Sequence, residues 1–228
     1  MFDGQFRSSV DKAVKPLGDS LRKTRISPDH LTIAGLVIAC GAAVSIALGH
    51  LALGLLLVIL AALPDLLDGA LAKASNTSSQ RGAFFDSVID RVTDSLLLGG
   101  IAWYLAGEES AYVAILPFAV AAASSVISYE RAKAESLGLS AKGGLMERAE
   151  RIIMLCLGLL FPVLLVPILW VMLVLTTVTA LQRFVKVWNQ AAVAPVTAER
   201  IELRRSRRRS RRAARRSRLT VARRQRRT

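Results

Sequence analysis

Long stretches of this chain consist of apolar positions, and the charged positions lie between them. No Asp, Glu, Lys or Arg occurs in residues 31–64, 95–107, 111–128 or 152–182. A helix that crosses a bilayer needs roughly 20 mainly apolar residues, and it satisfies its own backbone hydrogen bonds, as lipid requires. The pattern therefore predicts an all-α integral membrane protein.

Six transmembrane helices are expected from these four segments. One span is predicted at about residues 86–105 and another at about 111–131, and the first and last segments are each long enough for two. The predicted interruptions fall at turn-forming or helix-breaking residues, which are Gly49, His50 and Gly54 in the first segment and Pro162 and Pro167 in the last. We expect a six-helix domain over residues 26–190.

Residues 1–25 show a different pattern, in which apolar side chains recur every three or four positions. These apolar positions are Phe2, Phe6, Val10, Val14, Leu17 and Leu21. Basic residues lie between them, and a predicted span follows directly. This periodicity predicts an amphipathic helix that lies in the headgroup plane of the membrane.

The net charge of +14 is concentrated at the C-terminal end, where residues 199–228 contain 15 Arg and 2 Glu. Arginine blocks of this kind are typically disordered and solvated, so residues 191–228 are predicted to form a disordered cytoplasmic tail. Anionic lipid headgroups attract such residues by about 1 kcal/mol each. No interleaved aromatic residues or folded module accompany the tail, so specific nucleic-acid binding is not expected.

The distribution of basic residues between the predicted spans indicates an orientation. Lys and Arg occur before the first span, after the second, after the fourth and in the tail, whereas the alternate connections contain none. Because basic residues favour the cytoplasmic side, both termini and the segment after the second span are predicted to be cytoplasmic. The expected location is the cell membrane, with multiple passes.

Four aspartates lie beside the most apolar part of the chain. Asp65 and Asp68 are three residues apart at the end of the second predicted span, and Asp86 and Asp90 are four apart in the third. Each pair therefore lies on one helical face. The polar segment 69–82 is expected to turn the chain on the cytoplasmic side, so that four carboxylates line one pocket.

Unpaired carboxylates at the membrane edge repel each other and lose hydration, which costs several kcal/mol. Mg²⁺, or alternatively Mn²⁺, prefers oxygen ligands, and four carboxylates can hold two such ions about 4 Å apart. Ion pairs with Lys73, Arg81 and Arg91 are the structural alternative. Gly69 and Gly82 flank the segment and allow a close approach of a helix or ligand.

This constellation resembles the signature of the CDP-alcohol phosphotransferase family, which reads D-x-x-D-G-x-x-A-R, eight residues, then G-x-x-x-D-x-x-x-D. The matching positions are Asp65, Asp68, Gly69, Ala72, Lys73, Gly82, Asp86 and Asp90. Lys73 stands where the family has arginine, which keeps the charge but loses the bidentate fork for phosphate.

The resemblance implies transfer of a phosphatidyl group from CDP-diacylglycerol to an alcohol, with release of CMP, by a homodimer. It implies that the four aspartates hold two metal ions and that Asp90 is the base that deprotonates the acceptor hydroxyl. The implied contacts with CDP-diacylglycerol are Asp29, His30, Leu31, Thr32, Gly69, Lys73 and Ser79. Independently of the resemblance, Ser27, Pro28 and Asp29 are a helix-start signal.

The segment between the fourth and fifth spans carries five basic residues, as a phosphorylated acceptor would require. A role in topology alone is the other interpretation. The pattern S-Y-x-R-A-K-A-E from residue 128 and E-R-x-E-R from residue 147 is similar to the actinobacterial phosphatidylinositol phosphate synthases, whose acceptor is inositol phosphate. By this similarity, the acceptor phosphate would be held by Ser128, Arg131, Arg151 and Arg183.

Three alternatives stay open at this point. Phosphatidylglycerophosphate synthase, which uses glycerol 3-phosphate, would need similar basic partners. A divalent-cation transporter would place its acids near the bilayer midplane rather than at its edge. An inactive member of the family is disfavoured because all four aspartates are present.

Overall fold

The computed structural model describes residues 28–75, 80–109 and 112–192, with side chains described for all of them except residues 28 and 64–75. The helices in these ranges are α2 (Pro28–Ala47), α3 (Leu51–Ser75), α4 (Gln80–Glu108), α5 (Ile115–Ser136), α6 (Arg148–Leu160) and α7 (Leu165–Ala191), with a 3₁₀ turn, η1 (Pro162–Leu164), before α7. The predicted all-α fold is confirmed. The expected amphipathic helix (residues 1–25) lies outside the described ranges, as does residue 193 onward of the expected tail.

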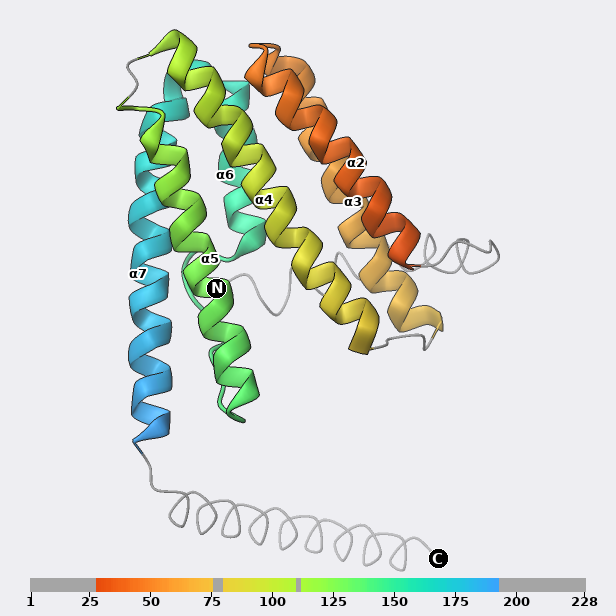
Figure 1. Ribbon diagram of the computed structural model, residues 1–228, viewed down its shortest axis with the longest axis vertical. Helices are drawn as coiled ribbons and strands as arrows, with labels where there is room; N and C mark the ends of the chain where they lie inside the picture. The colour runs from red at the N-terminus through yellow and green to blue at the C-terminus, as the bar shows by residue number, and fades with distance from the viewer. Residues whose placement is uncertain (1–27, 76–79, 110–111, 193–228) are drawn as a thin grey trace, which may run out of the picture.

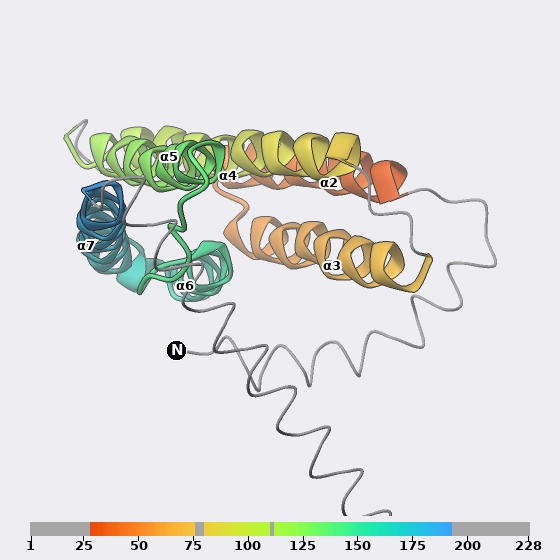
Figure 2. The same ribbon diagram turned by 90° about the horizontal axis from the view of Figure 1, so that it is seen from below.

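The six helices form two layers of three, seen end-on in Figure 2. One layer consists of α5, α4 and α2, and the other consists of α7, α6 and α3. Helices α2 and α4 pack side by side within the first layer, and α6 packs against both α3 and α7 within the second. The contacts of α2 with α3 and of α5 with α7 join the layers.

Successive helices run in opposite directions, as short connections between neighbouring helices require. Figure 1 shows that α2, α4 and α6 begin toward the lower side of the molecule, where α3, α5 and α7 end. The starts of α2, α4 and α6 therefore lie on the same side of the molecule as the ends of α3, α5 and α7. Chain direction alone gathers residues that are far apart in the sequence.

Both predicted interruptions are present, but two of the five residues expected to form them lie inside helices. The turn between α2 and α3 uses Gly49, whose φ of +80° favours glycine, but Gly54 lies inside α3, where an added Cβ would collide with Ile46. The chain breaks at Pro162 in η1, but Pro167 lies in the first turn of α7. The N–H groups of a first turn have no partner within the helix, so proline at this position costs no hydrogen bond.

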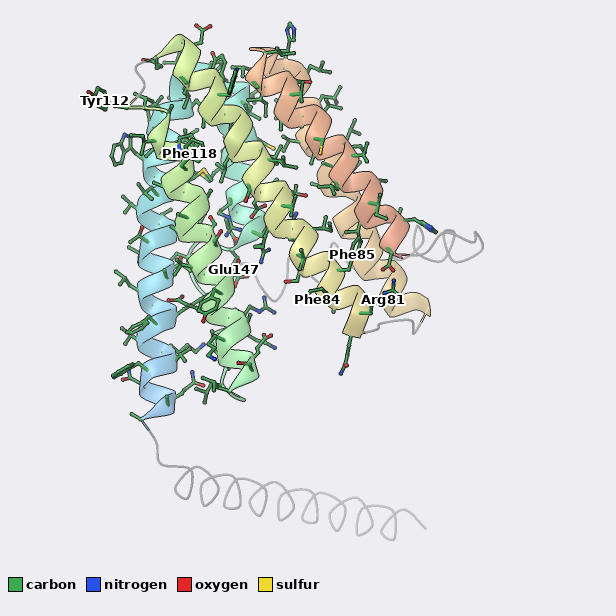
Figure 3. The ribbon with its side chains drawn as sticks, viewed as in Figure 1. Arg81, Phe84, Phe85, Tyr112, Phe118 and Glu147 are labelled. Atoms are coloured by element: carbon green, nitrogen blue, oxygen red, sulfur yellow. The ribbon has the colours of Figure 1, made fainter. Side chains whose placement is uncertain are left out.

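Close helix packing and an exposed apolar surface characterise the bundle. A Cβ on Gly100 of α4 would lie 2.5 Å from the carbonyl oxygen of Ala43 in α2, so glycine is required for this approach. Large apolar side chains such as Val37, Trp103 and Phe118 are exposed to the outside, and Figure 3 shows Phe118 on α5. Exposed apolar surface of this extent is typical of contact with lipid or another protein.

Two helical stretches among the described residues are long and apolar enough to cross a membrane. They are Asp29–Ala47, with a mean hydropathy of 2.0, and Pro162–Ala191, with a mean hydropathy of 2.4. The apolar part of α3, Leu51–Leu63, is shorter. Six spans therefore stay a prediction.

Candidate functional site

Helix α4 carries three aspartates on one face between its second turn and its middle. Asp86, Asp90 and Asp94 follow one another at intervals of four residues, close to one helical turn. Figure 3 shows the beginning of α4, with Arg81 and Phe84, at the lower side of the molecule. All three aspartates are half-buried. Within the described part of the chain, Asp86 makes no ion pair.

Asp90 lies between two guanidinium groups. Its Oδ1 atom is 2.6 Å from Nη1 of Arg148, at the start of α6. Its Oδ2 atom is 3.2 Å from Nη2 of Arg91, the next residue in α4. Arg91 in turn donates from Nη1 to the Ser128 hydroxyl on α5, at 2.8 Å. Asp90 is thus connected to both α5 and α6.

Asp94 makes the second set of contacts between α4 and α6. Its Oδ2 atom accepts a hydrogen bond from Nη2 of Arg151 at 2.8 Å, and its Oδ1 atom is 3.5 Å from Nε of Arg148. Arg148 therefore bridges Asp90 and Asp94. The four side chains form one chain of charges, which we call the α4–α6 network: Asp90, Arg148, Asp94 and Arg151.

The first turn of α6 is fixed by a capping box. The backbone N–H of Glu147 donates to Oε2 of Glu150 at 3.2 Å, and the Glu147 side chain accepts from the N–H of Glu150 in return. Such reciprocal bonds satisfy donors that a helix start otherwise leaves unpaired. They hold Arg148 and Arg151 one turn apart, facing α4.

The α5–α6 loop, residues 137–147, is anchored along one face of α7. The Thr179 hydroxyl accepts from the backbone N–H groups of Leu145 and Met146, at 3.2 and 3.0 Å. About three turns further along α7, the Gln190 amide exchanges two hydrogen bonds with the Ser140 backbone, at 2.8 and 3.1 Å. These bonds fix the position from which α6 starts.

Arg183 lies between these anchors and is buried. It donates from Nε to the carbonyl of Gly143 at 2.9 Å, from Nη1 to that of Ile127 at 3.3 Å, and from Nη2 to Oε1 of Glu147 at 3.2 Å. Three of its five donors are thus used by the protein itself. Arg183 also lies within electrostatic range of Arg131 and Arg151, so the three predicted acceptor arginines share one neighbourhood.

Ser128 and Arg131 complete the set of predicted acceptor residues. The Ser128 hydroxyl donates to the carbonyl of Ser124 at 3.0 Å and accepts from Arg91. The Arg131 side chain is half exposed and pairs with Glu135 at 3.1 Å. Such an exposed pair contributes little to stability and is easily opened.

The predicted nucleotide residues lie partly outside the described side chains. Helix α2 begins at Pro28, which confirms the predicted helix start, and its first turn holds Asp29, His30, Leu31 and Thr32. Thr32 is buried and His30 is exposed. Gly69 and Lys73 lie in α3, where only the backbone is described, and Ser79 lies outside the described residues.

The predicted metal site can be tested only in part. Asp65 and Asp68 belong to one continuous helix, as predicted, but their side chains are outside the described set. Among the side chains that are described, no three His, Cys, Asp or Glu residues are placed to hold a metal ion. The donor set nevertheless fits a hard divalent cation, which prefers carboxylate oxygens. A carboxylate has about four lone-pair sites, so pairing with arginine does not by itself exclude a metal on Asp90.

Sequence reasoning did not identify Asp94, Arg91 or Arg148 as site residues. Asp94 extends the D-x-x-x-D part of the signature by one more turn, so the repeat of four was a usable signal. Arg148 was predicted only as one of the five basic residues that a phosphorylated acceptor would require. The structural ion-pair alternative considered Lys73, Arg81 and Arg91, whereas Asp90 is paired with Arg91 and Arg148.

Known proteins resemble the chain over most of its length. The sequence profile of the CDP-alcohol phosphatidyltransferase family matches residues 25–189. Phosphatidylinositol phosphate synthase from Mycobacteroides abscessus is 38% identical over 189 residues, which cover 78% of this chain and 84% of the relative. The chain therefore belongs to the CDP-alcohol phosphatidyltransferase family, and the predicted enzyme class, a phosphatidyltransferase, is confirmed.

Solved structures of a related enzyme share the fold. The crystal structure of Mycobacterium tuberculosis phosphatidylinositol phosphate synthase with CDP-DAG bound gives a TM-score of 0.72 at 30% identity and covers 78% of this chain and 94% of that chain. The complex of that enzyme with manganese and citrate gives a TM-score of 0.71 at 30% identity, covering 77% and 88%. Divalent metals thus bind a member of this family.

Proposed function

We propose that this protein transfers the phosphatidyl group of CDP-diacylglycerol to a hydroxyl of inositol phosphate and releases CMP. The α4–α6 network is the observation that carries the proposal. Through Arg148 and Asp94 it links Asp90, the proposed base, to Arg151, a proposed ligand of the acceptor phosphate. A phosphorylated acceptor bound to Arg151 would thereby have its hydroxyl close to Asp90.

The charge of the acceptor side supports a phosphorylated acceptor. Arg131 and Arg151 each lie within electrostatic range of Arg183, and Arg148 lies one turn from Arg151. Arginine binds phosphate through short, paired hydrogen bonds, and a phosphate dianion would relieve the repulsion among these cations. An unphosphorylated polyol would not. The names of the relatives support inositol phosphate over glycerol 3-phosphate.

In the proposed reaction the acceptor oxygen attacks the phosphorus of the phosphatidyl group. The new P–O bond forms as the bond to CMP breaks, and Asp90 takes the proton of the acceptor hydroxyl. General-base help of this kind contributes roughly 10² to 10⁴ in rate. Ser128 and Arg131 would orient the acceptor, and Arg183 would do so with the donors that the α5–α6 loop leaves it.

The donor substrate is proposed to bind between α2, α3 and α4. Asp29, His30, Leu31 and Thr32 would contact the nucleotide from the first turn of α2, and Gly69, Lys73 and Ser79 would do so from the end of α3 and beyond it. Two divalent ions, Mg²⁺ or Mn²⁺, on Asp65, Asp68, Asp86 and Asp90 would polarise the pyrophosphate and neutralise the leaving CMP. A manganese complex of a related enzyme supports a divalent metal.

The membrane arrangement is part of the same proposal. The six helices would all span the cell membrane, with both termini and the site on the cytoplasmic side, because the basic connections and the site residues share one side. The protein would act as a homodimer, and the tail would attract anionic headgroups.

The proposal is tested with purified protein in detergent, CDP-diacylglycerol and Mg²⁺, by measuring CMP release with each acceptor separately. We expect CMP with inositol phosphate, much less with glycerol 3-phosphate, and none after chelation of the metal, with recovery when Mg²⁺ or Mn²⁺ is returned. CMP release with glycerol 3-phosphate alone would assign the protein to phosphatidylglycerophosphate synthesis instead.

A further inference from the structure

Asp94 lies outside the family signature, yet it holds two arginines of the acceptor side. We propose that Asp94 is a positioning residue for the acceptor phosphate: its carboxylate orients the guanidinium groups of Arg148 and Arg151 so that both face one phosphate. This inference rests on the proposed function, because it assumes a phosphorylated acceptor.

Burial makes the contact with Arg151 directional. The Asp94 side chain is 13% exposed and that of Arg151 is 8% exposed, so neither is freely hydrated. Both line a cavity of about 20 Å³ whose other walls are apolar, formed by Leu97, Leu98, Ile152, Leu155 and Met172. A buried guanidinium without a carboxylate partner is costly. Without Asp94, Arg151 would be expected to turn from this apolar surface toward water.

Electrostatic repulsion gives a second reason for a carboxylate at this position. Arg148 and Arg151 lie one turn apart on α6, and Arg183 lies within electrostatic range of Arg151. Like charges at this spacing push each other apart. The carboxylate of Asp94 contacts both α6 arginines, at 2.8 Å and 3.5 Å. It therefore holds them on the α4 side before an acceptor arrives.

The contact leaves the arginines able to bind phosphate. Asp94 engages a single Nη2 atom of Arg151, and a guanidinium has five N–H donors in all. Arg148 reaches Asp90 through Nη1 and Asp94 through Nε. This fixes the plane of its guanidinium relative to the proposed base. Errors of about 1 Å in such positioning cost on the order of 10² in rate.

The test compares Asp94→Asn with Glu108→Gln, the same loss of charge at the exposed far end of the same helix. CMP release is first measured with varied inositol phosphate at saturating CDP-diacylglycerol. It is then measured with varied CDP-diacylglycerol at saturating inositol phosphate. We expect Asp94→Asn to raise the acceptor KM at least tenfold and to leave the CDP-diacylglycerol KM within twofold. Asp94→Glu restores the charge and should recover part of the acceptor KM. Glu108→Gln should match the wild type.

Calorimetric binding of inositol phosphate, without CDP-diacylglycerol, gives a readout independent of turnover. We expect at least tenfold weaker binding of inositol phosphate to Asp94→Asn. If that variant does not fold, the binding of inositol phosphate to Asp94→Glu is the test, and we expect weaker binding than to the wild type because the longer side chain displaces the carboxylate. An unchanged acceptor KM in an active Asp94→Asn protein, or equal rises in both KM values, would overturn the inference. A wild-type protein that releases CMP with neither phosphorylated acceptor overturns the proposed function and the inference with it.

Discussion

Two buried threonines in α7 provide a test of how the α5–α6 loop is held. Thr176 and Thr179 lie one turn apart, and both side chains are fully buried. The Thr179 hydroxyl accepts from the backbone N–H groups of Leu145 and Met146, whereas no hydrogen-bond partner for the Thr176 hydroxyl is found among the described residues. Replacement by valine keeps the shape of either side chain and removes only the hydroxyl.

The expected loss of unfolding free energy in Thr179→Val follows from the two backbone N–H donors that the substitution leaves without an acceptor. Met146 is buried, so its unpaired N–H costs about 1–3 kcal/mol. Leu145 is exposed, so water can replace its partner, and about 0.5–1 kcal/mol is lost there. The sum is about 1.5–4 kcal/mol. Thr176→Val removes a buried polar group that has no partner, so it should be neutral or stabilising by up to about 1 kcal/mol.

Thermal unfolding of the two variants and the wild type in the same detergent measures this difference. For a protein of this size, about 1.5–4 kcal/mol corresponds to a fall in Tm on the order of 10 °C, and we expect this for Thr179→Val alone. Equal shifts for the two variants would refute the reasoning, because they would show that the loop does not depend on the Thr179 hydroxyl.

Three further predictions use single substitutions. Gly100→Ala should lower Tm by several degrees, because its Cβ would meet the backbone of Ala43, whereas Gly99→Ala, with open space at its Cβ, should leave Tm unchanged or raise it; similar shifts would argue against the close approach of α2 and α4. Asp90→Asn should abolish CMP release while Tm stays within a few degrees of the wild type, and an active variant would exclude Asp90 as the base. Lys73→Arg should lower the KM for CDP-diacylglycerol about two- to tenfold through a bidentate phosphate contact, and an unchanged KM would show that Lys73 does not touch the pyrophosphate.

The order and number of the described helices could be predicted from the sequence, because an apolar segment in lipid must satisfy its backbone hydrogen bonds within a helix. Boundaries were less predictable. The polar segment 69–82 was expected to turn the chain, but helix α3 continues into it as far as Ser75. The limit of a span is set by hydration, whereas the limit of a helix is set by backbone hydrogen bonds, and the two need not coincide.

Glycine and proline illustrate why the residues that form the interruptions between helices were only partly predictable. Gly49 is required by its positive φ and Gly54 by the side chain of Ile46, but both are simply small residues in the sequence. Pro162 ends a helix, and Pro167 stands in the first turn of the next. Whether a glycine or proline interrupts a helix depends on its position relative to the helix ends. The pattern of apolar residues does not show where those ends lie.

The site was predictable in its local parts and not in its long-range pairs. Asp86 and Asp90 are four residues apart in one helix, so their position on one face could be predicted from the sequence. The pairing of Asp94 with Arg151 joins residues 57 positions apart, and it depends on how α6 lies against α4. Arg183 was predicted as a phosphate ligand, but no sequence pattern indicated that it also holds the α5–α6 loop. That role depends on the backbone carbonyls that the fold brings to it.

The anchoring of the α5–α6 loop on α7 imposes an order on how the protein is made. Helix α4, with its aspartates, is complete roughly 80 residues before the end of α7 is synthesised, which is about 4–16 s at 5–20 residues per second. Until Thr179, Arg183 and Gln190 emerge, nothing among the described contacts of α7 fixes the loop that starts α6. The metal-binding half proposed for the site thus exists in the nascent chain before the acceptor half, which is completed only when α7 is made.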